Sequence, residues 1–166
     1  MTTKTAEKAF ATRNDLPKEA RADAVELINA NLLNLIDLYS QTKYAHWNLK
    51  GLSFIGVHKL LDELAEHVED AIDETAERAT ALGGIARGTV RHAAEGSALE
   101  EFPSNVFDIP ALIAALADRF ATAAKGVRDG IDAADELGDK DTADMFTDTS
   151  RMLDKSLWLL EAHITK

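Results

Sequence analysis

The sequence contains no cysteine, which excludes disulfides, thiolate metal sites and a cysteine nucleophile. It also contains no apolar run close to the roughly 20 residues that are needed to cross a bilayer. The opening stretch MTTKTAEKAF has no apolar signal core. We therefore expect a protein of the cytoplasm that has no membrane partner.

Basic residues are scarce, and three of them stand near the start of the chain. Lysine and arginine number 18 against 29 aspartates and glutamates, so the net charge is −11. An acidic surface repels nucleic acid and attracts cations. Residues 1–14 carry Lys4, Lys8 and Arg13 against Glu7, a net charge of +2. We predict that residues 1–14 form a flexible tail and that any contact with DNA would be made by this tail. Three basic residues are also typical of an ordinary solvated tail.

Apolar residues recur at the spacing of an α-helix in four long segments, and no segment shows a convincing strand pattern. The first predicted helix follows Asp15, which can cap it, and Pro17, which suits a first turn. Its apolar stripe extends to His46, so we expect this histidine to face inward. The other predicted helices cover about residues 54–82, 109–137 and 142–164.

The connection between the second and third predicted helices is long and covers about residues 83–107. Because two long helices stand on each side of it, we expect it to run the length of a bundle. The sequence therefore predicts that residues 15–166 form one all-α domain, a four-helix bundle with the long crossover of ferritin-like folds.

Four metal-binding side chains are expected on one stripe of the second helix: His58, Asp62, Asp73 and Glu77. A helix advances about 100° per residue, which places them at about −40°, 0°, +20° and +60° around its axis. His58 and Asp62 are four residues apart, as are Asp73 and Glu77, so each pair could place two donors on one ion. The same spacing also arises on an acidic helix face that is merely solvated.

The two pairs are too far apart on one helix to share an ion, since their midpoints are separated by about 22 Å. Antiparallel packing against a second copy, around a two-fold axis near position 67, would bring each pair beside the complementary pair of the mate. His46 could complete each site from the first helix. Glu66 and Glu69 share the stripe and would crowd near the axis, where their repulsion favours bound cations, protonation or water.

No histidine in the chain has a glutamate three positions before it. A di-iron centre inside a single four-helix bundle relies on that Glu-x-x-His motif from two helices. Metal ligands in a bundle without the motif need another location, and a subunit interface supplies one.

Four stretches of the sequence resemble the Dps proteins, the mini-ferritins of starved or oxidatively stressed bacteria. They are AHWNLKG, FIGVHKLLDEL, ERATALGG and DTADMFTDTSRMLDKSLWLLEAHI, and the resemblance covers about residues 12–164. It implies a short helix within the crossover and assembly of twelve copies into a hollow homododecamer. It also implies a di-iron ferroxidase centre whose ligands are His46, His58 and Asp62 of one subunit with Asp73 and Glu77 of its two-fold mate.

The implied activity is oxidation of Fe(II), preferably by hydrogen peroxide, with storage of Fe(III) mineral in the cavity and protection of DNA. Zinc could compete for the same ligands. Trp47 matches a tryptophan beside the centre, and Lys43 matches a lysine held near the ligands. Acidic residues of the last two long helices are candidates for lining iron-entry pores: Asp118, Asp135, Asp139 and Asp144.

Two other functions stay open from the sequence. One is a DNA-compacting nucleoid protein with little iron turnover, because some relatives bind DNA through lysine-rich tails and twelve tails multiply a weak contact. The other is a four-helix protein whose acidic stripe is only solvated. The filled ligand positions favour the ferroxidase over the solvated stripe, and the poorly basic tail disfavours DNA compaction.

Overall fold

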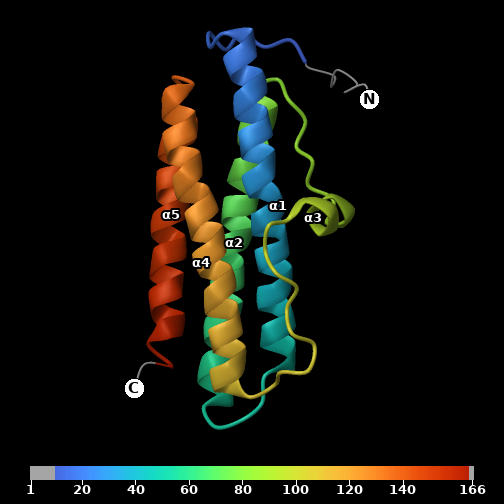
Figure 1. Cartoon of the computed structure of the whole chain (residues 1–166), viewed down its shortest axis with the longest axis vertical. Coiled ribbons are helices and arrows are strands. Elements are labelled where there is room, and N and C mark those ends of the chain that lie inside the picture. Colours follow the sequence, from blue (N-terminus) through green and yellow to red (C-terminus); the bar gives the residue numbers. More distant parts are fainter. Residues whose placement is uncertain (1–9, 165–166) are drawn as a thin grey trace.

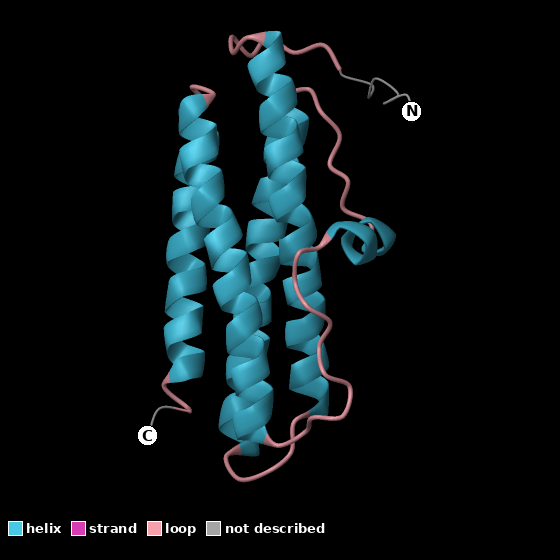
Figure 2. Cartoon of the chain, in the orientation of Figure 1, coloured by secondary structure: helices cyan, strands magenta, loops and turns pink. Residues whose placement is uncertain are grey.

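The computed structural model describes residues 10–164, which form five α-helices (Figures 1 and 2). This described part of the chain contains no β-strand, only an isolated bridge between Lys50 and Asp108, so the all-α prediction is confirmed. None of its helices is long and apolar enough to span a bilayer. The helices are α1 (Lys18–Asn48), α2 (Phe54–Ala81), α3 (Val90–Gly96), α4 (Ile109–Glu136) and α5 (Lys140–Glu161).

The four long helices form two antiparallel pairs, α1 with α2 and α4 with α5 (Figure 1). Short turns at residues 49–53 and 137–139 join the members of each pair. Residues 82–108 connect the two pairs, and they run from one end of the bundle to the other. The short helix α3 lies within this connection and packs against α1. The predicted crossover and its short helix are therefore confirmed.

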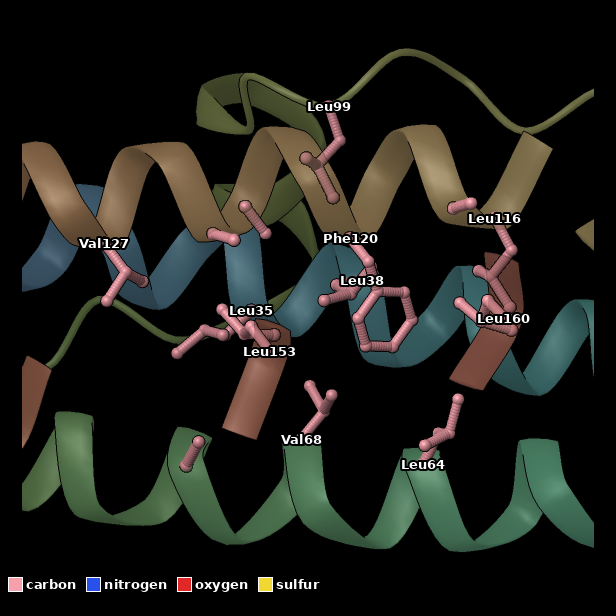
Figure 3. Close-up of a cluster of buried hydrophobic side chains, with 14 of the residues drawn as sticks. Leu35, Leu38, Leu64, Val68, Leu99, Leu116, Phe120, Val127, Leu153 and Leu160 are labelled. Carbon is pink, nitrogen blue, oxygen red and sulfur yellow. The ribbon is translucent and has the colours of Figure 1, made fainter. Parts of the chain in front are cut away.

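A core of apolar side chains lies between the four long helices (Figure 3). Leu35 of α1, Leu64 of α2, Phe120 of α4 and Leu153 of α5 are fully buried in it. Leu99 of the crossover belongs to the same cluster. Each large apolar side chain buried in this way contributes about 1.5–3 kcal/mol. The core therefore sets the relative positions of the helices that carry the candidate metal ligands.

The predicted start of α4 is confirmed, whereas the predicted cap of α1 is wrong. Asp108 caps α4 by accepting a hydrogen bond from the backbone N–H of Ala111 at 3.2 Å. α1 has Pro17 at its cap position, and no side chain bonds its first turn there. The proline side chain has no oxygen that could accept a hydrogen bond from the first turn, so Pro17 cannot replace an aspartate as a cap.

Asp139 caps α5 and is buried in an ion pair. It is 1% exposed, and the helix that it caps begins at Lys140, two residues before the predicted start. Its carboxylate accepts hydrogen bonds from Arg78 Nη2 and from the Thr142 hydroxyl, each at 2.5 Å. These bonds join the end of α2 to the α4–α5 turn. The proposal that Asp139 lines a pore is wrong, because its carboxylate faces the interior of its own subunit.

The other three candidate pore residues are exposed on α4 and α5. Asp135 forms an ion pair with Lys140 at 2.7 Å, near the same end of the bundle. A role in a pore stays a prediction for Asp118, Asp135 and Asp144.

The last residues of the predicted tail lie against the end of α2. The backbone N–H of Phe10 donates to the carbonyl oxygen of Gly83 at 2.7 Å. Arg13 is exposed. The other two basic residues of the tail, Lys4 and Lys8, lie outside the described residues, so their proposed role in binding DNA stays a prediction.

We expect Asp139→Ala to lower the free energy of unfolding by about 3 kcal/mol, because Arg78 would lose its buried anion and keep only exposed Asp141, at 3.8 Å. The matched variant Asp135→Ala removes an exposed, paired carboxylate and should cost less than about 1 kcal/mol. Urea unfolding followed by circular dichroism measures both. Similar losses in the two variants would contradict a special role for the buried pair.

Candidate metal centre

α1 and α2 bring His46, His58 and Asp62 to the same level of the bundle. His46 is 8% exposed, which confirms the prediction that it faces inward. His58 and Asp62 are half-buried and stand one helical turn apart on α2. The Nε2 atom of His46 lies 3.8 Å from Oδ1 of Asp62. One predicted ligand from α1 and two from α2 are therefore close together.

The side chain of each histidine bonds to the backbone carbonyl oxygen of the other histidine. Nδ1 of His46 lies 2.8 Å from the carbonyl oxygen of His58, and Nδ1 of His58 lies 3.0 Å from that of His46. Because a carbonyl oxygen can only accept, we assign the ring hydrogen to Nδ1 in both residues. The lone pair of each neutral ring is then on Nε2, which is the atom free to bind a metal.

Ring stacking restricts the histidines further. The centroids of the His46 and His58 rings are 3.7 Å apart, and the ring planes differ by 21°. The ring of Phe54 stacks on His58 with a centroid distance of 5.1 Å. The two imidazoles are therefore held in place before any metal binds, which reduces the entropy lost on binding.

Asp62 is engaged by a lysine of α1. Nζ of Lys43 donates a hydrogen bond to Oδ1 of Asp62 at 2.5 Å. This bond holds the pKa of the Asp62 carboxyl below its usual value and raises the pKa of Lys43. Asp62 is therefore a carboxylate at neutral pH, and its Oδ1 is shared with an ammonium group that a metal ion would have to displace.

Asp73 and Glu77 are not near the other three predicted ligands. They are exposed on α2, 11 and 15 positions beyond Asp62, which corresponds to about 16 Å and about 22 Å along the helix axis. Over residues 10–164, no three histidine, aspartate or glutamate side chains are placed to hold one ion. Within one subunit the predicted ligands therefore lie in two separate groups, and residues 10–164 contain no complete set of three.

Two large apolar side chains close in sequence to the predicted ligands are exposed. Trp47 is 65% exposed and Ile55 is 60% exposed. Ile55 lies at about +20° on the same stripe of α2 as Asp62. Exposed apolar groups next to an incomplete polar site are typical of a surface that another protein chain covers. Glu66 and Glu69, nearer the middle of the stripe, are also exposed.

The sequence contains no signal for the reciprocal bonds of His46 and His58. Their acceptors are backbone carbonyls, which every residue has, and the bonds require two helices in one particular register. The sequence places Phe54 only at the start of a helix, and it contains no signal for the stacking of this ring on His58.

Comparison with known proteins shows the family. A ferritin family model, described as a ferritin-like domain, matches residues 25–166. The chain is 43% identical over 157 residues to the DNA protection during starvation protein of Agrobacterium fabrum, covering 95% of this chain and 97% of that protein. It is 32% identical over 158 residues to DNA protection during starvation protein 1 of Deinococcus radiodurans, covering 95% of this chain and 76% of that protein.

Solved structures of Dps proteins are also similar to the structure of this chain. DpsC from Streptomyces coelicolor is similar with a TM-score of 0.92 and 26% identity, covering 100% of this chain and 97% of that chain. A Dps protein from Vibrio cholerae, described as a member of a broad superfamily of ferritin-like diiron-carboxylate proteins, has a TM-score of 0.86 and 26% identity, covering 95% and 99%. The chain therefore belongs to the Dps family of ferritin-like proteins.

Proposed function

We propose that the protein is a ferroxidase and iron-storage protein that oxidises Fe(II), preferably with hydrogen peroxide, and keeps Fe(III) mineral inside a dodecameric shell. Removing Fe(II) and peroxide together would protect DNA from oxidative damage in the cytoplasm. The observation that carries this proposal is the pair of imidazoles, His46 and His58, held beside Asp62 with both Nε2 atoms free.

The donor set suits Fe(II) as a substrate. Imidazole nitrogen and carboxylate oxygen both bind ferrous iron, and carboxylate also accommodates the harder ferric product. In the proposed centre, Asp73 and Glu77 of a two-fold mate add two carboxylates to the half-site of this subunit. Zn(II) uses the same donors and would compete with Fe(II) for them. Trp47 lies next to His46 in sequence and would line the same interface.

Hydrogen peroxide is a two-electron oxidant, which matches a centre for two Fe(II) ions. Each Fe(II) gives up one electron, the O–O bond breaks, and two protons complete two water molecules. Because both electrons are delivered together, no hydroxyl radical leaves the site. The role of the chain is to hold the two irons, and Lys43 pairs with the Asp62 carboxylate until iron competes for it.

The incomplete sites support a two-fold dimer, and membership of the Dps family supports twelve chains built from such dimers. Twelve chains of 18.1 kDa would form a particle of roughly 217 kDa, and each two-fold dimer would contain two identical centres. Exposed Trp47 and Ile55 would be covered at that interface. A protein that stays near 18.1 kDa in solution would contradict the shared centre.

Mixed shells test the shared centre directly. His58→Ala/Asp62→Ala and Asp73→Ala/Glu77→Ala each remove one half of every centre, so each double variant alone should lose nearly all fast Fe(II) oxidation. Shells reassembled from equal amounts of both should recover about a quarter of the centres, since random pairing leaves one intact centre in each mixed dimer.

The measurement is stopped-flow absorbance after anaerobic Fe(II) loading and addition of hydrogen peroxide. The control Glu63→Ala/Glu74→Ala removes two exposed carboxylates of α2 that lie off the ligand stripe, and it should oxidise iron like the wild type. Inactive variants with no recovery in mixed shells would mean that the centre is not shared, and unchanged rates in the variants would refute the ligand assignment.

Lys43→Met should strengthen binding of the first divalent ion about three- to tenfold, because it removes the ammonium that competes for Asp62. Anaerobic titration with Co(II), followed by its visible absorption, measures this affinity. Lys155→Met, which removes an exposed lysine from α5, is the control and should not change it. Weaker binding in Lys43→Met would show that the lysine positions Asp62 for the metal instead of competing with it.

DNA contact is proposed for the tail alone, with association to the nucleoid as its consequence. The triple variant Lys4→Ala/Lys8→Ala/Arg13→Ala should weaken retention of DNA in a gel shift, and the wild-type contact itself should disappear as salt is raised. The alternative function, DNA compaction with little iron turnover, requires tight DNA binding by shells that are inactive toward iron. DNA retention unaffected by the triple variant would mean that another surface binds DNA.

A further inference from the structure

A pocket of about 530 Å³ lies between α1, α3 and the crossover. Figure 1 shows α3 and the crossover beside α1. The pocket is lined by α1 at Asp37, which is nine positions before His46. Nine residues turn a helix by about 180°, so this pocket is on the opposite side of α1 from the candidate metal centre. It is therefore a separate site.

The charge of the pocket is negative. Asp37 and Glu101 contribute carboxylates, and no lysine, arginine or histidine is among the lining residues. Within residues 10–164, neither of the two carboxylates forms an ion pair. Asp37 is half-buried, so its charge is screened less than that of a fully exposed carboxylate. The pocket therefore favours a cation.

The remaining walls are aromatic and hydroxylic. The rings of Tyr44 and Phe102 pack edge to face with centroids 5.6 Å apart. Ser40 and Ser97 add hydroxyl groups from α1 and from the end of α3. Aromatic faces attract ammonium groups and also cover the methylene groups that such ions carry.

Hydrogen bonds hold the pocket open in its present shape. Nε2 of Gln41 donates to Asp37 Oδ1 at 3.0 Å and to the carbonyl oxygen of Glu100 at 3.1 Å. The buried guanidinium of Arg119 donates to the carbonyl oxygens of Glu100 and Glu101 at 3.2 Å and 2.8 Å. The crossover is thus bonded to α1 and α4 beside the pocket, so a ligand need not order it.

Gln41, one of the lining residues, has a side-chain oxygen without a hydrogen-bond donor. The side-chain oxygen Oε1 of Gln41 is buried and accepts no hydrogen bond from the described residues. Buried carbonyl oxygens normally have a partner.

A transition-metal ion does not fit this lining, because residues 10–164 contain no group of three histidine, aspartate or glutamate side chains that could hold one. We propose that the pocket between α1, α3 and the crossover binds a small organic ammonium ion, with Asp37 as its anion and the rings of Tyr44 and Phe102 against its carbon chain. This site does not depend on the proposed iron chemistry.

The test is calorimetric titration of the assembled wild-type protein with 1,4-diaminobutane at moderate salt. We expect saturable binding of about one molecule per chain. Asp37→Asn keeps an oxygen for the Gln41 hydrogen bond and removes only the charge, so it should weaken binding roughly tenfold. Ala94→Phe, at an exposed lining position of α3, should abolish binding by filling the pocket without changing the charge.

Two controls separate a built pocket from general attraction to an acidic protein. Asp132→Asn removes the same charge from an exposed position of α4 and should change the affinity less than twofold. 1,4-Butanediol has the same chain length without charge and should not bind. The proposal is overturned if no saturable binding occurs, if Asp132→Asn weakens binding as much as Asp37→Asn does, or if Ala94→Phe binds normally.

Discussion

The Nδ1 atoms of His46 and His58 each donate to the backbone carbonyl oxygen of the other residue, and these two bonds fix the register between α1 and α2 at the metal end of the pair. A shift of one residue along either helix would break both bonds. It would also separate Lys43 from Asp62, whose ion pair spans the same two helices. The ligand geometry therefore depends on helix packing as much as on the ligands themselves.

The rest of the bundle keeps α2 in position for this arrangement. Apolar side chains of all four long helices meet along its inner face, and Arg78 attaches its far end to Asp139. With its inner face buried and its end fixed, α2 presents a regular outer face. That face carries His58 with Asp62 toward one end and Asp73 with Glu77 toward the other, which is the arrangement that a two-fold axis can use.

The two sides of α1 carry different chemistry. On the side toward α2, imidazole nitrogen and carboxylate oxygen are gathered in the pattern that transition metals prefer. On the side toward α3, carboxylates meet aromatic rings, a combination that suits organic cations. An acidic protein attracts cations in general. The groups around each carboxylate determine which class of cation binds there.

Local pattern alone determined the long helices, the inward direction of His46 and the single stripe of α2, because these follow from the 3.6-residue period of one helix. It also predicted that one subunit would be incomplete. Tertiary structure decided the burial of Asp139, the His46–His58 bonds and the pocket at Asp37. Each of these depends on groups distant in the sequence, many of them backbone atoms, which meet only when the helices pack.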